Sequence, residues 1–486
     1  MKGIGNSPVR ATARVLSSRI ACAGVAIACC LAGPAGAAPD TTSGVLPDGT
    51  AYRIDVPDNW NGTVLIGLDY AARDPMAETD ASRTSRKLLE QGYAMAGTTR
   101  AVTGWAIHLA AANAVRTLDL FTAKYGKPKY AIQFGSSQGG HAAAVGIQAY
   151  PERWNGAVIQ CGGLSGTVGQ WQAKFDALFV ARTLLAPDGK LPITGLPKDF
   201  KTTAMPAWHA VLDKAQQTPQ GRARIALAAR IGQLPEWSDS AIPAPAPGDL
   251  QARQQGLFHS LAGARNVVDQ GLSSRSQIEA LSGGNITGNI GVDYARLLRQ
   301  ADGDGMVRAL YQAAGLDLEA DLAALARAPR IAADRSALAY VASGVFDGRL
   351  QAPVLTLSGT GDAISVVAAQ QSYAAAVATA GKQDLLRQVY TASAGHCNFT
   401  PAESVAAVSA LMHRLASGSW PDTSAAAMNR AASAVQGGPS RFIDFTPPPV
   451  LRPYTPCDLE RDLGGEAQSA GKLTGVRVPG CLPPRS

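Results

Sequence analysis

Ser137 stands in the pentapeptide Gly-Ser-Ser-Gln-Gly at 135–139, whose pattern Gly-x-Ser-x-Gly can present a nucleophile. The apolar run 130–134 before it predicts a strand, and the small-residue run 140–146 after it predicts a helix. A strand, a sharp turn and a helix are the setting of a nucleophile elbow, in which the turn lifts the serine hydroxyl clear of a sheet. We therefore predict that Ser137 is a covalent catalyst. The alternative is a glycine-rich loop with a solvated serine.

Two further residues could activate Ser137, because a serine hydroxyl needs a base and a group that orients the base. His396 lies in Ala-Gly-His-Cys after the expected strand 385–390, and Asp362 lies in Gly-Thr-Gly-Asp after the expected strand 353–357. Both would reach the carboxyl edge of a parallel sheet, and the chain order Ser, Asp, His fits an elbow nucleophile. The alternatives are a loop or capping histidine and a turn or N-cap aspartate. We expect His141, one helical turn beyond the serine, to serve packing or hydrogen bonding.

Hydrolysis also needs donors for the oxyanion of a tetrahedral intermediate. One backbone N–H is expected from Gln138, the residue after the nucleophile. The second is expected from the loop after the strand 62–67, at Leu68, Asp69 or Tyr70.

The elements around these residues alternate between strand and helix patterns, which predicts an α/β fold with a mostly parallel sheet and helices on both faces. The expected strands are 51–56, 62–67, 93–98, 130–134, 156–161, 353–357 and 385–390, and the expected helices here are 106–125, 366–380 and 401–415. From 164 to 350 the patterns are helical, with a Pro-rich connector at 242–248. Such an insertion between two strands predicts a cap or lid.

The chain is therefore expected to have five segments. They are a signal peptide at 1–37, the N-terminal part of the core at 38–163, a helical lid at 164–350, the C-terminal part of the core at 351–416, and a Pro/Gly-rich tail at 417–486 that wraps the surface.

The first segment has the three parts of an export signal. It carries basic residues without acidic ones, an apolar run at 20–31, and Ala-Gly-Ala at 35–37, which fits a cleavage site. The apolar run is short for a membrane span, so we expect cleavage and a mature chain without a transmembrane segment, in the periplasm or the medium. A lipoprotein acylated at Cys29 or Cys30 is the alternative, although the preceding residues fit a lipobox poorly.

Composition excludes some classes of partner. The 486 residues are 46% hydrophobic and 17% charged, which is a globular composition. Removing the four basic residues of the signal lowers the net charge from +7 to +3. That bias is too small to indicate nucleic acid or an anionic membrane as a partner. The sequence does not predict an oligomeric state.

Four cysteines follow the signal: Cys161, Cys397, Cys457 and Cys481. An even number in an exported chain indicates two disulfides with three possible pairings. The last two lie in one tail and are the natural local pair, which leaves the first two for each other. Zinc-ligand spacing is lacking, so no metal is expected.

These features together resemble the α/β-hydrolase superfamily over about 45–416, and within it the secreted bacterial serine esterases grouped with tannases and feruloyl esterases. Those relatives often join a cysteine beside the nucleophile to one beside the histidine. Here Cys397 follows His396, but Ser136 precedes the nucleophile. The resemblance therefore implies a variant bridge from Cys161 to Cys397.

The start of the expected lid carries an aromatic stripe. Trp171, Phe175 and Phe179 are spaced four residues apart on one helix face, either as lid core or as the lining of an aryl or acyl pocket. Asp-Gly-Asp-Gly at 302–305 is faintly like a calcium loop but lacks the other ligands, so we expect a turn.

The main hypothesis is a secreted serine hydrolase that cleaves a small carboxylic ester through an acyl-enzyme, without a cofactor. A secreted exopeptidase of the prolyl-peptidase type is the first alternative, since it shares the order of the three residues. A non-catalytic binding protein on the same fold is the second, although none of the three residues is missing.

Overall fold

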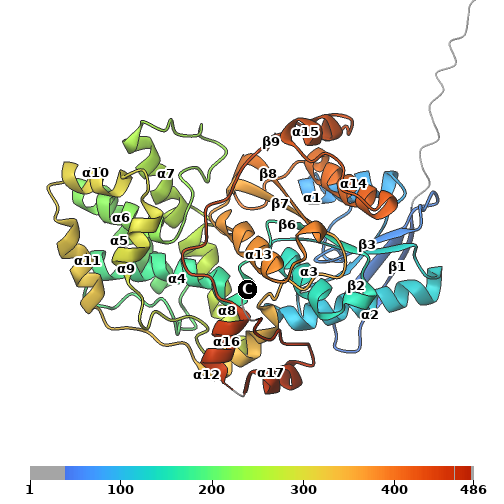
Figure 1. Cartoon of the computed structure of the whole chain (residues 1–486), viewed down its shortest axis with the longest axis horizontal. Helices are drawn as coiled ribbons and strands as arrows, with labels where there is room; N and C mark the ends of the chain where they lie inside the picture. Colours follow the sequence, from blue (N-terminus) through green and yellow to red (C-terminus); the bar gives the residue numbers. More distant parts are fainter. Residues whose placement is uncertain (1–38, 465, 483–486) are drawn as a thin grey trace, which may run out of the picture. The chain divides into compact units, whose positions relative to one another are not determined.

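A nine-stranded sheet forms the centre of the computed structural model, which describes residues 39–464 and 466–482. The order is β1-β2-β4-β3-β5-β6-β7-β8-β9 (Figure 1). Strands β4, β3, β5, β6, β7 and β8 are parallel, whereas β1, β2 and β9 pair antiparallel with their neighbours. The bounds are β1 Asp40–Val45, β2 Ala51–Val56, β3 Thr63–Leu68, β4 Ala94–Thr98, β5 Tyr130–Ser136, β6 Gly156–Gln160, β7 Val354–Gly361, β8 Leu386–Ala394 and β9 Phe442–Ile443.

Helices cover both faces of this sheet. Val64 and Ile66 of β3 pack in one core, and Leu65 between them packs in the opposite core. The first core includes residues of α2 (Ile107–Tyr125), α3 (Gln138–Ala149) and α13 (Ala368–Thr379), and the second includes α1 (Asp80–Glu90), α14 (Pro401–Ser417) and α15 (Ala425–Ser433). All three β3 residues are fully buried, which is why such strands are continuous apolar runs in the sequence. The expected α/β fold is confirmed.

Every regular element between β6 and β7 is a helix. Helix α4 (Gly166–Leu185) leaves the sheet edge and enters a helical cluster, beside the sheet in Figure 1, that has its own apolar core. The further helices are α5 Ala204–Gln216, α6 Pro219–Ile231, α7 Leu250–Ala262, η2 Val267–Gly271, α8 Leu272–Ser282, α9 Tyr294–Ala301, α10 Met306–Ala313, α11 Leu318–Arg327, α12 Arg335–Val341 and η3 Ala342–Gly344.

The C-terminal segment is more regular than its composition indicates. After α15 it adds the short edge strand β9 to β8, and it ends in α16 (Pro456–Leu463) and α17 (Glu466–Thr474). Between β9 and α16, Arg452 bonds the buried carboxylate of Asp176 in α4 at 2.6 Å, so the segment packs on the inserted helices. The tail is therefore part of the fold rather than a plain surface wrap.

Two N-terminal elements are absent from the sequence-based expectation. Strand β1 is mostly exposed and polar, and α1 has a polar sequence whose N-terminus is capped by Thr79. Neither has the apolar run that marks the central strands. The expected signal peptide and its cleavage site lie outside the described residues. Over the part of the chain that is described, no helix has the length and apolar character to span a membrane.

Candidate active site

The turn between β5 and α3 holds Ser137 in a left-handed conformation, with φ 57° and ψ −122°. Its N–H donates to the carbonyl of Gln160 in β6 at 3.0 Å, which fixes the turn to the neighbouring strand. A Cβ added at Gly135 would collide with the carbonyl of Gly139, and one added at Gly140 would lie 2.8 Å from the carbonyl of Gln160. This close approach of backbones explains why small residues surround the serine.

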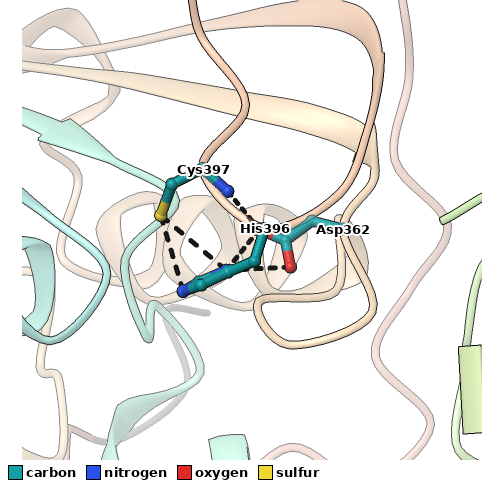
Figure 2. Close-up of side chains that lie close together, drawn as sticks. All are labelled: Asp362, His396 and Cys397. Carbon is teal, nitrogen blue, oxygen red and sulfur yellow. Dashed lines mark hydrogen bonds and ion pairs between the residues drawn. The ribbon is translucent and has the colours of Figure 1, made fainter. Parts of the chain in front are cut away.

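The structure brings the three expected residues together. His396 Nε2 lies 2.7 Å from Ser137 Oγ, and His396 Nδ1 lies 2.8 Å from Asp362 Oδ2. Asp362 follows β7 and His396 follows β8, so parallel strands deliver both to the edge where β5 ends. Figure 2 shows the imidazole beside the carboxylate.

Buried hydrogen bonds hold the Asp362 carboxylate in place, and the side chain is only 1% exposed. Its Oδ1 accepts the N–H groups of Ile364 and Ser365, each at 2.8 Å. Its Oδ2 accepts the N–H of Cys397 at 3.4 Å, which Figure 2 also marks. Charge-assisted bonds of this kind stabilise a buried carboxylate and orient it toward the imidazole.

A disulfide ties this loop to the sheet. Cys161, directly after β6, is bonded to Cys397, directly after His396, with 5.4 Å between their Cα atoms. Cys457 and Cys481 form the second disulfide, so the structure contains both expected pairings. Asp362, His396 and Cys397 lie close enough to suggest a metal site, but the Cys397 sulfur is already in the disulfide and cannot supply a thiolate ligand.

The two loops expected to hold the oxyanion are joined by side chains. Gln138 is the first residue of α3, where a helix leaves N–H groups without partners inside the helix. Its side-chain Oε1 accepts from Arg100 at 2.6 Å, and Arg100 also forms an ion pair with Asp69. Asp69 has φ 70° in the turn after β3, Leu68 ends that strand, and Tyr70 is buried. The Asp69 turn and the elbow are thus held in one arrangement.

A small cavity of about 20 Å³ adjoins the serine. Its lining comes from the sheet edge, from α4 and from the start of α8: Trp105, Ser137, Gln138, His141, Gly163, Gln170, Trp171, Lys174, Gln270, Ser274, Ile364 and Ser365. His141 is buried, and burial lowers its pKa to about 4, so the imidazole is neutral at pH 7. Its Nε2 lies 3.2 Å from Thr167 Oγ1, in keeping with a packing and hydrogen-bonding role.

The aromatic stripe divides between two environments. Trp171 lines the cavity with Ser137, but Phe175 and Phe179 are fully buried in the core of the helical insertion. The stripe follows α4 away from the sheet edge, so only its first member reaches the serine. Of the two expected roles, the two phenylalanines have the first, since they are core residues of the inserted helices and do not line this cavity.

Sequence reasoning missed Lys174 and Gln170, which line the same cavity from α4. Both donate to the carbonyl of Ile364, at 2.7 and 2.6 Å. The sequence contains only a weak signal for them, because Lys174 lies between the aromatic residues Trp171 and Phe175 but Gln172 and Asp176 beside it are polar too.

Asp-Gly-Asp-Gly at 302–305 forms a turn before α10. Asp302 accepts the N–H of Val307 at 2.9 Å, and Asp304 accepts Arg230 at 2.9 Å. Because N–H groups and an arginine already engage these carboxylates, the segment is a helix-capping turn.

Comparison with known proteins places the chain in a family. A family model described as tannase-like and of unknown function matches residues 44–295. The o-phthalyl amidase of Xanthobacter agilis is 32% identical over 423 residues, which cover 81% of this chain and 91% of that protein.

Solved structures with a similar arrangement include feruloyl esterase B from Aspergillus oryzae, at 14% identity and a TM-score of 0.35, covering 79% of this chain and 81% of that one. Candida antarctica lipase A in its closed state has 13% identity and a TM-score of 0.35, covering 87% and 85%. Likeness at this level carries no conclusion about activity. On the match of the family model and of the amidase over most of both chains, the protein belongs to the tannase-like family of unknown function (DUF6351).

Proposed function

We propose that this protein is a serine hydrolase that cleaves a carboxylic ester through an acyl-enzyme on Ser137. The observation that carries the proposal is the continuous set of contacts from Ser137 Oγ to His396 at 2.7 Å and from His396 to Asp362 at 2.8 Å. Three separate loops supply these residues, and each is held by its own backbone hydrogen bonds or by the disulfide.

The geometry supports a two-step reaction. Ser137 Oγ attacks the ester carbonyl while His396 Nε2 takes its proton, and Asp362 holds Nδ1–H and stabilises the imidazolium. The tetrahedral oxyanion would accept N–H groups from Gln138 and from the turn at 68–70. His396 then protonates the leaving alcohol, and a water activated by the same histidine releases the acid.

An amide is the second candidate substrate, because a relative at 32% identity is named an o-phthalyl amidase. The phthalyl group is a benzene ring with two adjacent carboxyl functions. The same serine chemistry cleaves an amide if His396 protonates the leaving nitrogen. The choice between ester and amide depends on how well the site places that proton.

An exopeptidase of the prolyl-peptidase type has less support. Such an enzyme needs free acidic groups in the lid for the charged terminus of its peptide. Glu236 is paired with Arg253 at 2.6 Å, and Asp321 is paired with Arg224 at 2.8 Å. These pairs neutralise two of the acids of 164–350 that could serve, and Asp239 lies 3.9 Å from His259.

We also propose that segment 1–37 exports the chain and that the helices of 164–350 cover the active site. Two disulfides are compatible with an oxidising compartment outside the cytoplasm. Trp171 of α4 and Ser274 of α8 line the cavity beside Ser137, which supports the role of these helices as a lid.

The test is hydrolysis of p-nitrophenyl acetate, p-nitrophenyl benzoate and the matching anilides by residues 38–486. We expect ester turnover that falls about a million-fold in kcat in Ser137→Ala, as for serine hydrolases that lose their nucleophile. Anilide turnover above ester turnover would favour the amidase. Equal rates for the wild type and Ser137→Ala would refute the proposed function.

A further inference from the structure

Lys174 is a buried cation without a counter-ion. The side chain is 3% exposed, and its ammonium donates to the carbonyls of Ile364 at 2.7 Å and Gln170 at 3.2 Å. No carboxylate in residues 39–464 or 466–482 forms an ion pair with it. Desolvation lowers the pKa of Lys174 to about 7, since burial penalises the charged form. An ammonium has three donors, so carbonyls account for two and one remains.

Trp171 provides a second donor beside this ammonium. Its indole Nε1 is buried and has no hydrogen-bond partner among the described residues. The Lys174 ammonium lies 4.8 Å from the centre of the indole ring. Buried indole N–H groups are normally bonded, so an orphan donor indicates a missing acceptor.

Both residues line the cavity that contains Ser137. A positive charge without an anion and an N–H without an acceptor therefore lie beside the nucleophile. Burying an unpaired charge costs stability, and such a cost is expected where a ligand supplies the partner.

We propose that Lys174 and Trp171 bind a carboxylate of the substrate, so that the acyl group is one half of a dicarboxylic acid. The substrate is then a half-ester or half-amide: Ser137 attacks its esterified or amidated carbonyl, and water releases the free dicarboxylic acid and the alcohol or amine. The remaining ammonium N–H and the unpartnered indole N–H supply one donor for each of the two oxygens of a carboxylate. This inference rests on the proposed function and narrows its substrate class.

The cavity volume of about 20 Å³ holds little more than one water molecule. An acyl group therefore requires the side chains of α4 and α8 to move apart as it binds. The carboxylate of the substrate would then occupy the enlarged cavity, between the inserted helices and Ser137.

Lys174 also supports the loop that carries Asp362, because it bonds the carbonyl of Ile364. Gln170, one turn earlier on α4, donates to the same carbonyl at 2.6 Å but has no charge. Gln170→Leu is therefore a matched control that weakens the loop while leaving the cation.

The experiment compares monoethyl succinate with ethyl 4-methylpentanoate, in which an isopropyl group replaces the carboxylate, and monoethyl phthalate with ethyl 2-isopropylbenzoate. We expect the wild type to prefer the charged member of each pair. Lys174→Met should lower kcat/KM for the neutral member about as much as Gln170→Leu does, because both variants remove a donor to the Ile364 carbonyl. For the charged member the loss should be about 100-fold larger, the cost of losing one partner of a buried charge pair. Gln170→Leu should lower both members equally.

Two results would overturn the proposal: a wild-type preference for the neutral members, or an equal loss for both members in Lys174→Met, which would leave only a structural role. Binding of phthalate and of benzoate to the Ser137→Ala variant, by calorimetry, separates this inference from the proposed function. One outcome would refute the proposed function and still support the carboxylate site. In that outcome no ester is cleaved, but phthalate binds and Lys174→Met abolishes the binding. Equal affinity for phthalate in Ser137→Ala and in Ser137→Ala with Lys174→Met would refute the carboxylate site.

Discussion

Two buried charged residues near Ser137, Asp362 and Lys174, have opposite surroundings. Asp362, at the sheet edge, accepts three N–H groups and the imidazole, so its carboxylate is fully paired. Lys174, on the inserted helix α4, donates to two carbonyls and, within residues 39–464 and 466–482, forms no ion pair with a carboxylate. The protein itself supplies the hydrogen-bond partners of Asp362, whereas we propose that a carboxylate of the substrate supplies the missing partner of Lys174.

Removing the charge at the paired site is expected to have the largest effect. Asp362→Asn keeps the shape but loses the carboxylate that selects the tautomer of His396, so kcat should fall about 10,000-fold. Steady-state kinetics with p-nitrophenyl acetate measure this. Circular dichroism should remain that of the wild type, and a loss of less than tenfold would contradict the role given to Asp362.

Removing the disulfide beside His396 is expected to have the second largest effect. Cys161→Ala with Cys397→Ala is expected to lower the free energy of unfolding by about 2–4 kcal/mol. It should also lower kcat about tenfold, because the His396 loop loses its tie to the sheet.

The matched control is Cys457→Ala with Cys481→Ala, which removes the tail disulfide. Urea unfolding and ester kinetics, measured on both double variants, distinguish the contributions of the two disulfides. Full activity after verified loss of the first disulfide would refute a positioning role for it.

The smallest effect on the free energy of unfolding is expected at the unpaired charge, and it depends on pH. Lys174→Met should raise the free energy of unfolding by about 2 kcal/mol at pH 6, since removing a desolvated charge gains more than the lost hydrogen bonds cost. The folded pKa of about 7 lies below the ordinary 10.5. Between these values the unfolded chain binds a proton that the folded chain does not, so wild-type stability rises with pH relative to the variant.

Other charges act on Lys174 in this measurement. Asp362 raises and Arg275 lowers the pKa of Lys174, and the neutral His141 lines the same cavity. Urea unfolding at pH 6, 8 and 10 should show the advantage of Lys174→Met shrinking. A difference that does not change with pH would show that Lys174 is not a buried cation.

Much of the sheet and the contacts of the three site residues could be predicted from the sequence. Buried parallel strands are unbroken apolar runs, and their carboxyl ends share one edge, so Ser137, Asp362 and His396 could be placed together by chain order. Strand β1 could not, because an exposed edge strand has a polar sequence. The two-residue β9 is too short for any pattern.

The cavity lining was beyond sequence reasoning for a different reason. Which turn of α4 faces the serine depends on how the insertion docks on the sheet edge, and helical spacing does not contain that information. Trp171 and Phe175 are one turn apart, yet one lines the cavity and the other lies in the insertion core. The roles of Lys174 and Gln170 depend on the same docking.

The central claim is that Ser137 is the nucleophile, and covalent labelling tests it most directly. The protein is treated with a fluorophosphonate and digested, and the adduct is mapped by mass spectrometry. We predict an adduct on Ser137 that persists in Ser136→Ala, where the lost hydroxyl donates to the Gln160 side chain at 2.9 Å, and that disappears in Ser137→Ala. No adduct on Ser137, or an adduct on another residue that accounts for ester turnover, would contradict the account.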